Sequence, residues 1–470
     1  MSRINTNIPS MVAQGRLGRN QLDLNLRLER LATGLRINRG KDDPAGLIIS
    51  ERLRKEIRGI EQAINNSSRA INIISTAEGA LNEVSSLLLD IRGLIQSTAN
   101  TGGLSREETQ ANQQEIDSLL SSIDRIANTT QFAGKKLING DQGYLVSSVS
   151  TTNLASVQLF AVRLPPGTTR NVVVQVTQSA ETALLSFTGA STSAASIELR
   201  GNLGSEILSF ASGATTADIQ TAINSIKDVT GVSAIVSAST LMLSSTQYGS
   251  EQFVSVKALS GNFIQANAGQ TITDNGVDAG VLVNGQKAQV AGLKVNTRTS
   301  SLDAEFFLTS GFGTSASTST FQVTGGGSIY QIGQDVNVNG QVHTGIPSVS
   351  TGNLGNSVEG FLNSIRTGAA NAVADGKFIE AEKIVSAAIT QVSTLRGRLG
   401  SIQKNQLQTN INSQQIALEN VSSSESVIRD ADIAVEVAAL TRAQILVQST
   451  QTTLQIANSV PQAVLSLLGG

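Results

Sequence analysis

Apolar residues recur at helical spacing in the first part of the chain, where they predict two long amphipathic helices with a break between them. From Leu53 to Ile95, steps of four and three alternate almost throughout, and most of these positions are apolar. Such a repeat is typical of a coiled-coil seam. A heptad-like stripe also precedes the break, and it contains Leu17, Leu24, Leu28, Leu31 and Leu35.

The break itself is the segment "NRGKDDPAG", residues 38–46. Pro44 has no amide hydrogen and disfavours a helical conformation at Asp43, so the first helix has to stop before this point. Gly40 and Gly46 permit a turn. We therefore predict that the helix is interrupted at Gly40, Asp43, Pro44 and Gly46, and we interpret the acidic pair Asp42 and Asp43 as part of the helix junction and not as a metal site.

Between about residues 141 and 350 the pattern changes to short alternating runs rich in Ser, Thr, Gly and Asn, such as "NVVVQVTQ". These runs predict strands, and Asn284-Gly285 between two of them predicts a hairpin turn. One helix is expected to interrupt the strands at residues 215–229. Before this region, Ser105 and Glu108 predict a capping box at the start of a further helix.

Helical spacing returns near Ser357 and continues to the carboxyl end. We expect a long helix that frays at the serine cluster of residues 422–424, which with the following residues to 432 would form a second joint. The last segment again carries a heptad-like stripe: Ile433, Val437, Leu440, Val447, Leu454, Ala457, Val464 and Leu468.

Both apolar stripes lie at the extremities of the chain, where termini are usually loose and polar. If the two ends return to the same place, their helices can pair in antiparallel orientation. Because the stripes are wide (Leu22 and Leu26 broaden the first), apolar surface is left that other copies of the chain could cover. A non-closing contact between copies produces a filament. The alternative is that these helices pack entirely within their own chain.

Composition narrows the possible functions. The formal net charge is -2, which gives no reason to expect nucleic acid or an anionic membrane as a partner. Cysteine is absent, so disulfides, thiolate zinc sites and thiol nucleophiles are excluded. The start of the sequence lacks the apolar core of a cleavable signal peptide, and no stretch approaches the length of a membrane span.

The sequence offers little for catalysis. His343 is the only histidine, so a paired-histidine zinc motif cannot form, and a Ser-His-acid triad could only involve this one residue. The segment "TGGGSIYQIG", residues 324–333, lacks the Lys-Ser/Thr of a phosphate-binding loop. We therefore expect no enzyme activity, no cofactor and no metal.

Several motifs in order resemble the bacterial flagellin family. They are "RINTN" (3–7), "LERLATGLRINRGKDDPAGLIISERLR" (28–54), "NNSSRAINIISTAEGALNEV" (65–84), "IDRIANTTQFAGKKLING" (123–140), "LGSIQKNQL" (399–407), "SVIRDADIAVEVAALTRAQIL" (426–446) and "QIANSVPQAVLSLL" (455–468). Residues 214–236 resemble the small insertion motif of some flagellins and hook-associated proteins.

The resemblance implies a multidomain α+β fold with terminal antiparallel coiled-coil helices, a helical bundle with a β-hairpin region, and one or more β-rich central insertion domains. The implied domains are a coiled-coil helix of the inner tube (1–40), the amino-terminal part of the bundle and hairpin (41–164), a variable surface region (165–350), the carboxy-terminal part of the bundle (351–430) and a second inner-tube helix (431–470). The resemblance implies that the break at Gly40, Asp43, Pro44 and Gly46 is a hinge, which would join two radial layers of a filament. The inner-tube contacts would be made by Leu17, Leu24, Leu28, Leu31, Leu35, Val437, Leu440, Val447, Leu454, Val464 and Leu468.

The resemblance also implies a function. The chain would be a structural subunit that self-assembles into the flagellar filament for motility, located outside the cell and exported unfolded through the flagellar type III route. Its partners would be further copies of itself, an export chaperone, and the cap and hook-associated proteins. Two alternatives stay open, namely a hook-filament junction protein and a surface adhesin that acts through the central region.

A vertebrate Toll-like receptor reads many flagellins on a helix and its successor, through two arginines, a leucine and a glutamate. In this sequence Arg92, Leu94 and Glu115 match, but Asp90 stands where the leading arginine is expected. The charge reversal predicts weak receptor activation or none.

Overall fold

The computed structural model describes residues 6–165, 167–189, 193–264 and 268–468, and for residues 461, 462 and 464–468 it describes the backbone alone. The chain divides into two compact units. The unit that we call the terminal unit comprises Met1–Ser68, Gln331–Gly340 and Leu407–Gly470. The other, the central unit, comprises Arg69–Tyr330 and Gln341–Gln406. Each is described by itself.

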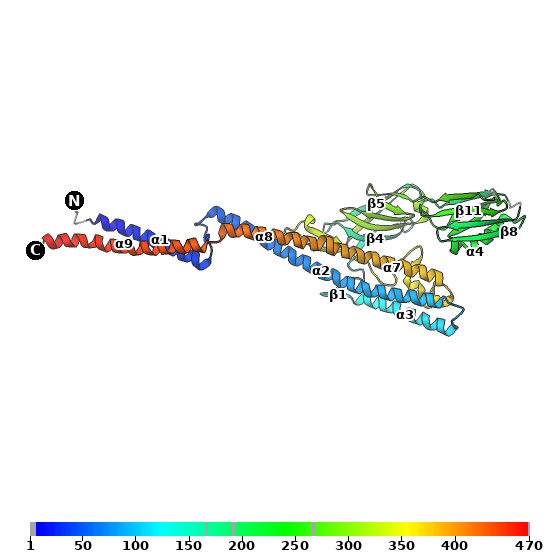
Figure 1. The fold of residues 1–470 in the computed structure, drawn as a ribbon, viewed down its shortest axis with the longest axis horizontal. Coiled ribbons are helices and arrows are strands. Elements are labelled where there is room, and N and C mark those ends of the chain that lie inside the picture. The colour runs from blue at the N-terminus through cyan, green and yellow to red at the C-terminus, as the bar shows by residue number, and fades with distance from the viewer. Residues whose placement is uncertain (1–5, 166, 190–192, 265–267, 469–470) are drawn as a thin grey trace. The chain divides into compact units, whose positions relative to one another are not determined.

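The terminal unit is helical. It contains α1 (Ile8–Thr33), the first part of α2 (Pro44–Thr98), α8 (Thr409–Arg429) and α9 (Ile433–Leu468), together with the short turn η1 (Val338–Gly340). Figure 1 labels these helices. The structure corrects one prediction here, because α8 continues through Ser422 to Ser424 and ends at Arg429. The break before α9 is therefore confined to residues 430–432.

The helices of the central unit are the rest of α2, α3 (Arg106–Thr129) and α7 (Phe378–Ser401), which a π-helical segment, η4 (Ile402–Gln408), continues into the terminal unit. The predicted capping box is present, since Ser105 Oγ accepts from the Glu108 amide and the Glu108 carboxylate accepts from the Ser105 amide. The carboxy-terminal helix starts at Phe378, later than the expected Ser357. The preceding residues form the turns η2 (Leu362–Ile365) and η3 (Val373–Asp375) and the pair β21 (Gly355–Asn356) and β22 (Gly360–Phe361).

Two sheets with a common apolar core make up the first β-region of the central unit. One has the order β14 (Gln286–Lys287), β13 (Gly280–Val283), β5 (Arg170–Gln178), β18 (Thr318–Gly326) and β3 (Tyr144–Ser147). The other has the order β15 (Gln289–Ala291), β16 (Lys294–Arg298), β17 (Leu302–Leu308) and β4 (Leu154–Val162), and α6 (Ser310–Gly313) follows β17. Val174, Phe306 and Phe321 are fully buried between the sheets.

The second β-region also has two sheets around one core. Their orders are β6 (Leu184–Thr188), β10 (Thr240–Ser245), β9 (Val232–Ser237), and β12 (Thr271–Asn275), β11 (Phe253–Ser260), β7 (Ala195–Gly201), β8 (Ser205–Phe210). Ile219 and Ile223 of α4 (Thr216–Ser225) complete this core, and α5 (Lys227–Thr230) follows. The helix predicted at residues 215–229 is thus present as α4 and α5.

Short hairpins complete the molecule: β1 (Gln131–Phe132) with β2 (Lys135–Lys136), and β19 (Ser328–Gln331) with β20 (Gln341–Thr344). The turn predicted at Asn284-Gly285 joins β13 to β14, and both of its residues have positive φ, 49° and 79°. Helical ends and a β-rich middle confirm the predicted α+β class.

Candidate functional site: the terminal helix pair

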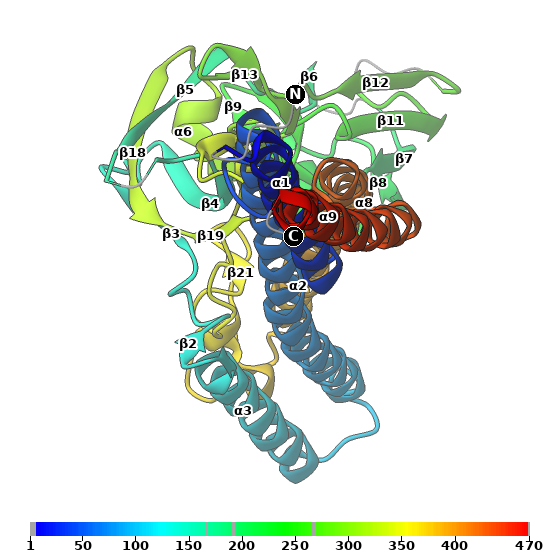
Figure 2. The same cartoon turned by 90° about the vertical axis from the view of Figure 1, so that its left-hand side faces the viewer.

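Helices α1 and α9 of the terminal unit lie side by side and run antiparallel (Figures 1 and 2). Nδ2 of Asn7, before α1, donates to the carbonyl oxygen of Ala457, 2.8 Å away and towards the end of α9. At the other end, Arg27 and Arg30 contact Glu436. The buried and half-buried positions between the helices alternate steps of three and four: Ser10, Ala13, Leu17, Asn20, Leu24, Arg27 and Leu31 on α1, and Glu436, Leu440, Ala443, Val447, Thr450, Leu454 and Ala457 on α9.

Glu436 is the most buried charged residue of this seam, with its side chain 7% exposed. Its two carboxylate oxygens accept from the guanidinium groups of Arg27, at 2.9 Å, and Arg30, at 3.0 Å. Burial alone would raise the pKa of Glu436, but the hydrogen bonds and charges of the two arginines outweigh burial, so its pKa is lowered. The carboxylate is therefore ionised at neutral pH and fixes how α1 and α9 align.

Outside the seam, both helices expose large apolar side chains. On α1 they are Ile8, Met11, Val12, Leu22 and Leu28, and on α9 they are Ile433, Val435, Val437, Ile445, Leu446, Ile456 and Val460, each at least 43% exposed. Many large exposed apolar side chains on one element indicate a site of interaction with another molecule. The helix pair therefore covers one stripe of each helix and leaves further apolar side chains of both uncovered.

The residues predicted for the inner tube fall into different groups. Leu17, Leu24, Leu31, Leu440, Val447 and Leu454 lie half-buried in the seam within the chain. Leu28 and Val437 are each 47% exposed and remain available to a neighbour, while Leu35 lies beyond the end of α1. Val464 and Leu468 lie where the structure does not describe side chains. Periodicity found the stripes, including the exposed Leu22 and Ile433, but it did not single out most of the other exposed residues, because spacing does not say which edge of a wide stripe meets the partner helix.

The segment that connects α1 to α2 and the segment that connects α8 to α9 are hydrogen-bonded to each other. Leu35 forms a β-bridge with Asp430, and the Arg36 amide donates to the Arg429 carbonyl, 2.7 Å away. The Ala431 amide donates to the carbonyl of Gly34. Gly34 ends α1 in the left-handed conformation, with φ 70°. Sequence analysis missed this glycine, although a glycine just after a helical stripe is a known stop signal.

The predicted hinge residues lie between α1 and α2 and in the first turn of α2. Oδ2 of Asp42 accepts from the amides of Asn38 and Arg39, and these bonds lower the pKa of Asp42. Asp43 accepts from the Gly46 amide at 2.9 Å and caps α2, while Pro44 opens that helix, where no amide partner is needed. A Cβ on Gly46 would collide with the Asp43 carboxylate and lie 2.8 Å from Cδ1 of Ile37, whereas a Cβ on Gly40 has ample room.

The four residues of the candidate receptor surface lie in the central unit, with Asp90, Arg92 and Leu94 on α2 and Glu115 on α3. Asp90 and Glu115 are exposed, and Leu94 is half-buried. Arg92 forms an ion pair with Glu382 of α7, with 2.8 Å between Nε and Oε1. The structure thus places a carboxylate at position 90 and a guanidinium engaged within the chain at position 92.

Among the described residues, no three His, Asp or Glu side chains gather in a way that could hold a metal ion. No helix among them is both long and apolar enough to span a membrane.

Comparison with known proteins assigns the family. Residues 4–143 match the bacterial flagellin N-terminal helical region, residues 383–468 match the C-terminal helical region, and residues 196–247 match the flagellin hook IN motif. Over 474 residues the chain is 30% identical to flagellin C of Vibrio anguillarum, covering 99% of both chains. The chain belongs to the bacterial flagellin family.

A flagellin from Salmonella rubislaw is 29% identical over 508 residues, again covering 99% of each chain. A solved structure, that of hook-associated protein 3 from Legionella pneumophila, aligns with 80% of this flagellin and 97% of its own chain. The two are 12% identical, with a TM-score of 0.31. As a flagellin, the chain is a structural subunit of the bacterial flagellar filament, and the main predicted function is confirmed. Its flagellin relatives are structural proteins.

Proposed function

We propose that the α1–α9 pair is the element through which this flagellin polymerises, forming the inner tube of the filament. The observation that supports this most is the set of large apolar side chains that the pairing of the two helices leaves exposed. Burying one Ile or Leu side chain is worth roughly 1.5–3 kcal/mol. Because the exposed residues occupy both helices over their length, copies that stack along and around an axis can cover them repeatedly.

The contact between copies is inferred to be heterologous, since the exposed residues of α1 and α9 differ. A heterologous contact that does not close into a ring extends into a helical filament. The hydrogen-bonded connecting segments, residues 34–38 and 429–431, would then hold α1 and α9 in a fixed position relative to the start of α2. This supports the predicted hinge and the predicted domain boundaries near residues 40 and 430.

The critical concentration for polymerisation tests this proposal. We expect Ile445→Ser and Ile456→Ser each to raise it roughly tenfold or more, since each removes an apolar side chain that is at least 60% exposed in the single chain. Gln451→Ser is the matched control, because Gln451 is an exposed polar residue of the same helix. Seeded polymer is sedimented at a series of concentrations and inspected by electron microscopy. Unchanged critical concentrations in both variants would contradict the proposal.

We further infer that the chain acts outside the cell after export, unfolded, by the flagellar type III route, without enzymatic activity. Its expected partners are an export chaperone and the cap and hook-associated proteins. The absence of cysteine and the low aromatic content, 3%, suit a chain that travels unfolded. Culture medium from strains with and without an intact flagellar export apparatus would test this, and appearance of the protein in both would contradict it.

The alternative that the chain is a hook-filament junction protein is less well supported. Its evidence is the terminal helices and the insertion motif, which flagellins and junction proteins both contain, whereas the match over 99% of both chains is to a flagellin. Copy number in sheared surface filaments separates the two, since a filament subunit has to dominate that preparation.

For the vertebrate receptor, we propose that this flagellin is a weak activator because Asp90 presents a negative charge where an arginine is expected. The ion pair of Arg92 with Glu382 adds a cost, since binding through Arg92 would require breaking it. We expect Asp90→Arg to increase signalling in a reporter-cell assay, and Glu83→Arg, an exposed acidic position on the same helix, to leave it unchanged. Full signalling by the unmodified monomer would contradict the proposal.

A further inference from the structure

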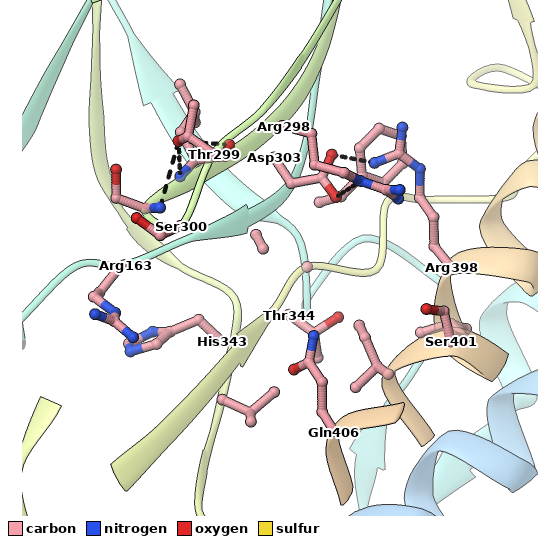
Figure 3. Close-up of a pocket in the computed structure, with 18 of the residues that line it drawn as sticks. Arg163, Arg298, Thr299, Ser300, Asp303, His343, Thr344, Arg398, Ser401 and Gln406 are labelled. Atoms are coloured by element: carbon pink, nitrogen blue, oxygen red, sulfur yellow. Dashed lines mark hydrogen bonds and ion pairs between the residues drawn. The ribbon is translucent and has the colours of Figure 1, made fainter. Parts of the chain in front are cut away.

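A cavity of about 430 Å³ lies within the central unit. It is lined by the end of β4, the turn between β16 and β17, strand β20, and the end of α7 with the start of η4 (Figure 3). Its volume is within the range of about 300–1,000 Å³ that small-molecule sites occupy. Neither the filament contacts nor the hinge use it.

The walls of the cavity are positively charged. Its lining includes three arginines, Arg163, Arg298 and Arg398, and one acidic residue, Asp303. Asp303 is already shared, since it pairs with Arg398 and, at 3.3 Å, with Arg298. The guanidinium of Arg398 also stacks on the Phe160 ring, 3.7 Å from its centroid. The lining therefore has more positive than negative side chains, and the Arg398 guanidinium is held in place by its ion pair and its contact with Phe160, which favours an anion.

His343 and Arg163 lie beside each other on another part of the wall (Figure 3). Burial and the charge of Arg163 both lower the pKa of His343, so the imidazole is neutral at pH 7. A neutral imidazole and a nearby guanidinium suit a negatively charged ligand that also offers polar groups without charge.

Three polar atoms of the lining residues are buried without a hydrogen-bond partner among the described residues: His343 Nε2, Gln341 Oε1 and Arg398 Nε. Such atoms cost about 1–3 kcal/mol each when nothing satisfies them. Arg398 Nε can only donate, and Gln341 Oε1 can only accept. A ligand that satisfies both therefore needs an acceptor and a donor, which a carboxylate with neighbouring hydroxyl groups supplies and a fully ionised oxyanion does not.

We propose that this cavity binds a small hydroxylated carboxylate, the chemical class of the sugar acids. The planar guanidinium groups match the geometry of a carboxylate, with which arginine forms two parallel hydrogen bonds. The Gln341 amide and the His343 ring bind the hydroxyl groups.

The single histidine makes the site directly observable, because the imidazole signals of the full-length chain come from His343 alone. Galacturonate, galactose and sulfate are titrated in turn at constant pH. We expect galacturonate to shift the imidazole resonances in a saturable way, sulfate, which has no donor, to bind at least about tenfold more weakly, and galactose to cause no shift. Equal binding of sulfate, or binding of galactose, would overturn the assignment, as would a lack of any saturable shift.

Substitutions in the cavity wall test whether the shift of the His343 resonances reports binding in the cavity. Combined Arg163→Gln and Arg298→Gln should weaken galacturonate binding about tenfold or more, and both side chains are partly exposed, so the fold should persist. Gln341→Met should weaken galacturonate binding but leave the weak sulfate binding unchanged, which a loss of folding would not do. Arg200→Gln removes the same charge from an exposed strand outside the cavity and should have no effect. An equal loss in Arg200→Gln would overturn the proposal.

Discussion

Glu436 is the residue on which the alignment of α1 and α9 depends most. Replacing it with glutamine removes the charge that Arg27 and Arg30 share, in a place where the carboxylate is almost fully buried. We expect Glu436→Gln to destabilise the helix pair by about 1–3 kcal/mol, measured as a lower melting temperature of assembled filaments. Asp23→Asn is the matched control. It removes a 44% exposed partner of Arg27 and should cost less than about 0.5 kcal/mol.

The same residue predicts a dependence on pH. Because its pKa is lowered below the ordinary value of 4.5, the ionised form stabilises the folded pair at any pH above that value. This stability is lost as the pH falls through the lowered pKa. Filaments of the parent chain and of Glu436→Gln should therefore melt at clearly different temperatures at neutral pH and at converging temperatures in acid. A difference that stays constant down to the lowest pH would show that the carboxylate acts only through its shape.

Gly46 and Gly40 test the hinge. An alanine at position 46 would push the Asp43 carboxylate away from the Gly46 amide and crowd Ile37, so we expect a loss of about 1–2 kcal/mol together with faster hydrogen exchange at the start of α2. At Gly40 the nearest atom to an added Cβ is Cδ2 of Leu47, 3.7 Å away, and alanine should be neutral. If both variants behaved alike, the geometry at Gly46 would not explain the need for glycine.

Among the elements, α2 shows what the sequence could and could not predict. Its helical nature was predictable, and much of the stripe from Leu53 to Ile95 is buried, including Ile60, Ile74 and Leu81. At alternate steps the predicted position is off by one residue. The repeat passes through Ile64, Ile71 and Glu78, which are half-buried, whereas their neighbours Ala63, Ala70 and Ala77 are buried. A pattern of large apolar residues does not single out buried alanines, which depend on how closely the packed segments approach.

This displacement leads to a prediction for α2. Ala77 is fully buried and Glu78 is half-buried, so a leucine should lower the stability of the chain much more at position 77 than at position 78. We expect Ala77→Leu to overpack the helical body and cost about 1–3 kcal/mol, and Glu78→Leu to change stability by less than about 0.5 kcal/mol. Chemical denaturation of the monomer measures both. Were Glu78→Leu the more damaging variant, the predicted seam would be the correct one.

Other elements show where local sequence signals are overruled. Three consecutive serines predicted a frayed helix, but α8 continues through them, and Ser424 Oγ donates to the Asn420 carbonyl one turn earlier. The capping box at Ser105 and the Asn284-Gly285 turn were predictable because both depend on neighbours within a few residues. The pairing of β5 with β18 was not, since the two strands are separated by a large part of the central region.

For the candidate site, the sequence predicted both stripes and the position of the hinge, and the comparisons supplied the family. It could not divide the leucines between the seam and the exposed surface, as Leu24 and Leu28 illustrate. Both belong to the same stripe, but only Leu24 faces α9. That division follows from the alignment of α1 with α9, which Glu436 and its arginines fix across most of the length of the chain.

On the scale of the whole molecule, the β-rich region begins and ends at one place in the central unit. The Ile346 amide donates to the Gln142 carbonyl, 3.0 Å away, and the Val349 amide donates to Ile138 at the same distance. The predicted boundary at residue 165 instead cuts through the first β-region, because β3 and β4 precede it and pair with β18 and β17. The hydrogen-bonded positions therefore mark where an inserted region can be removed.

We accordingly predict different outcomes for two deletions. Replacing residues 143–345 with a short Gly-Ser linker also removes Gln331–Gly340 of the terminal unit, whose Ile332 carbonyl accepts from Asn410. It should nevertheless preserve filament formation, with a critical concentration within about threefold of the parent, since the exposed apolar side chains of α1 and α9 are untouched. Deleting residues 165–347 leaves β4 without β17 and exposes Leu154 and Leu159, both buried in the full chain, so this product should aggregate. Sedimentation and electron microscopy distinguish ordered filaments from aggregate.

If the first deletion abolished polymerisation while its helices stayed folded, the central region would contribute to assembly, and the terminal pair alone would not account for the filament. If it polymerised but lost attachment to surfaces that the parent binds, the central region would carry the adhesive function that the sequence left open.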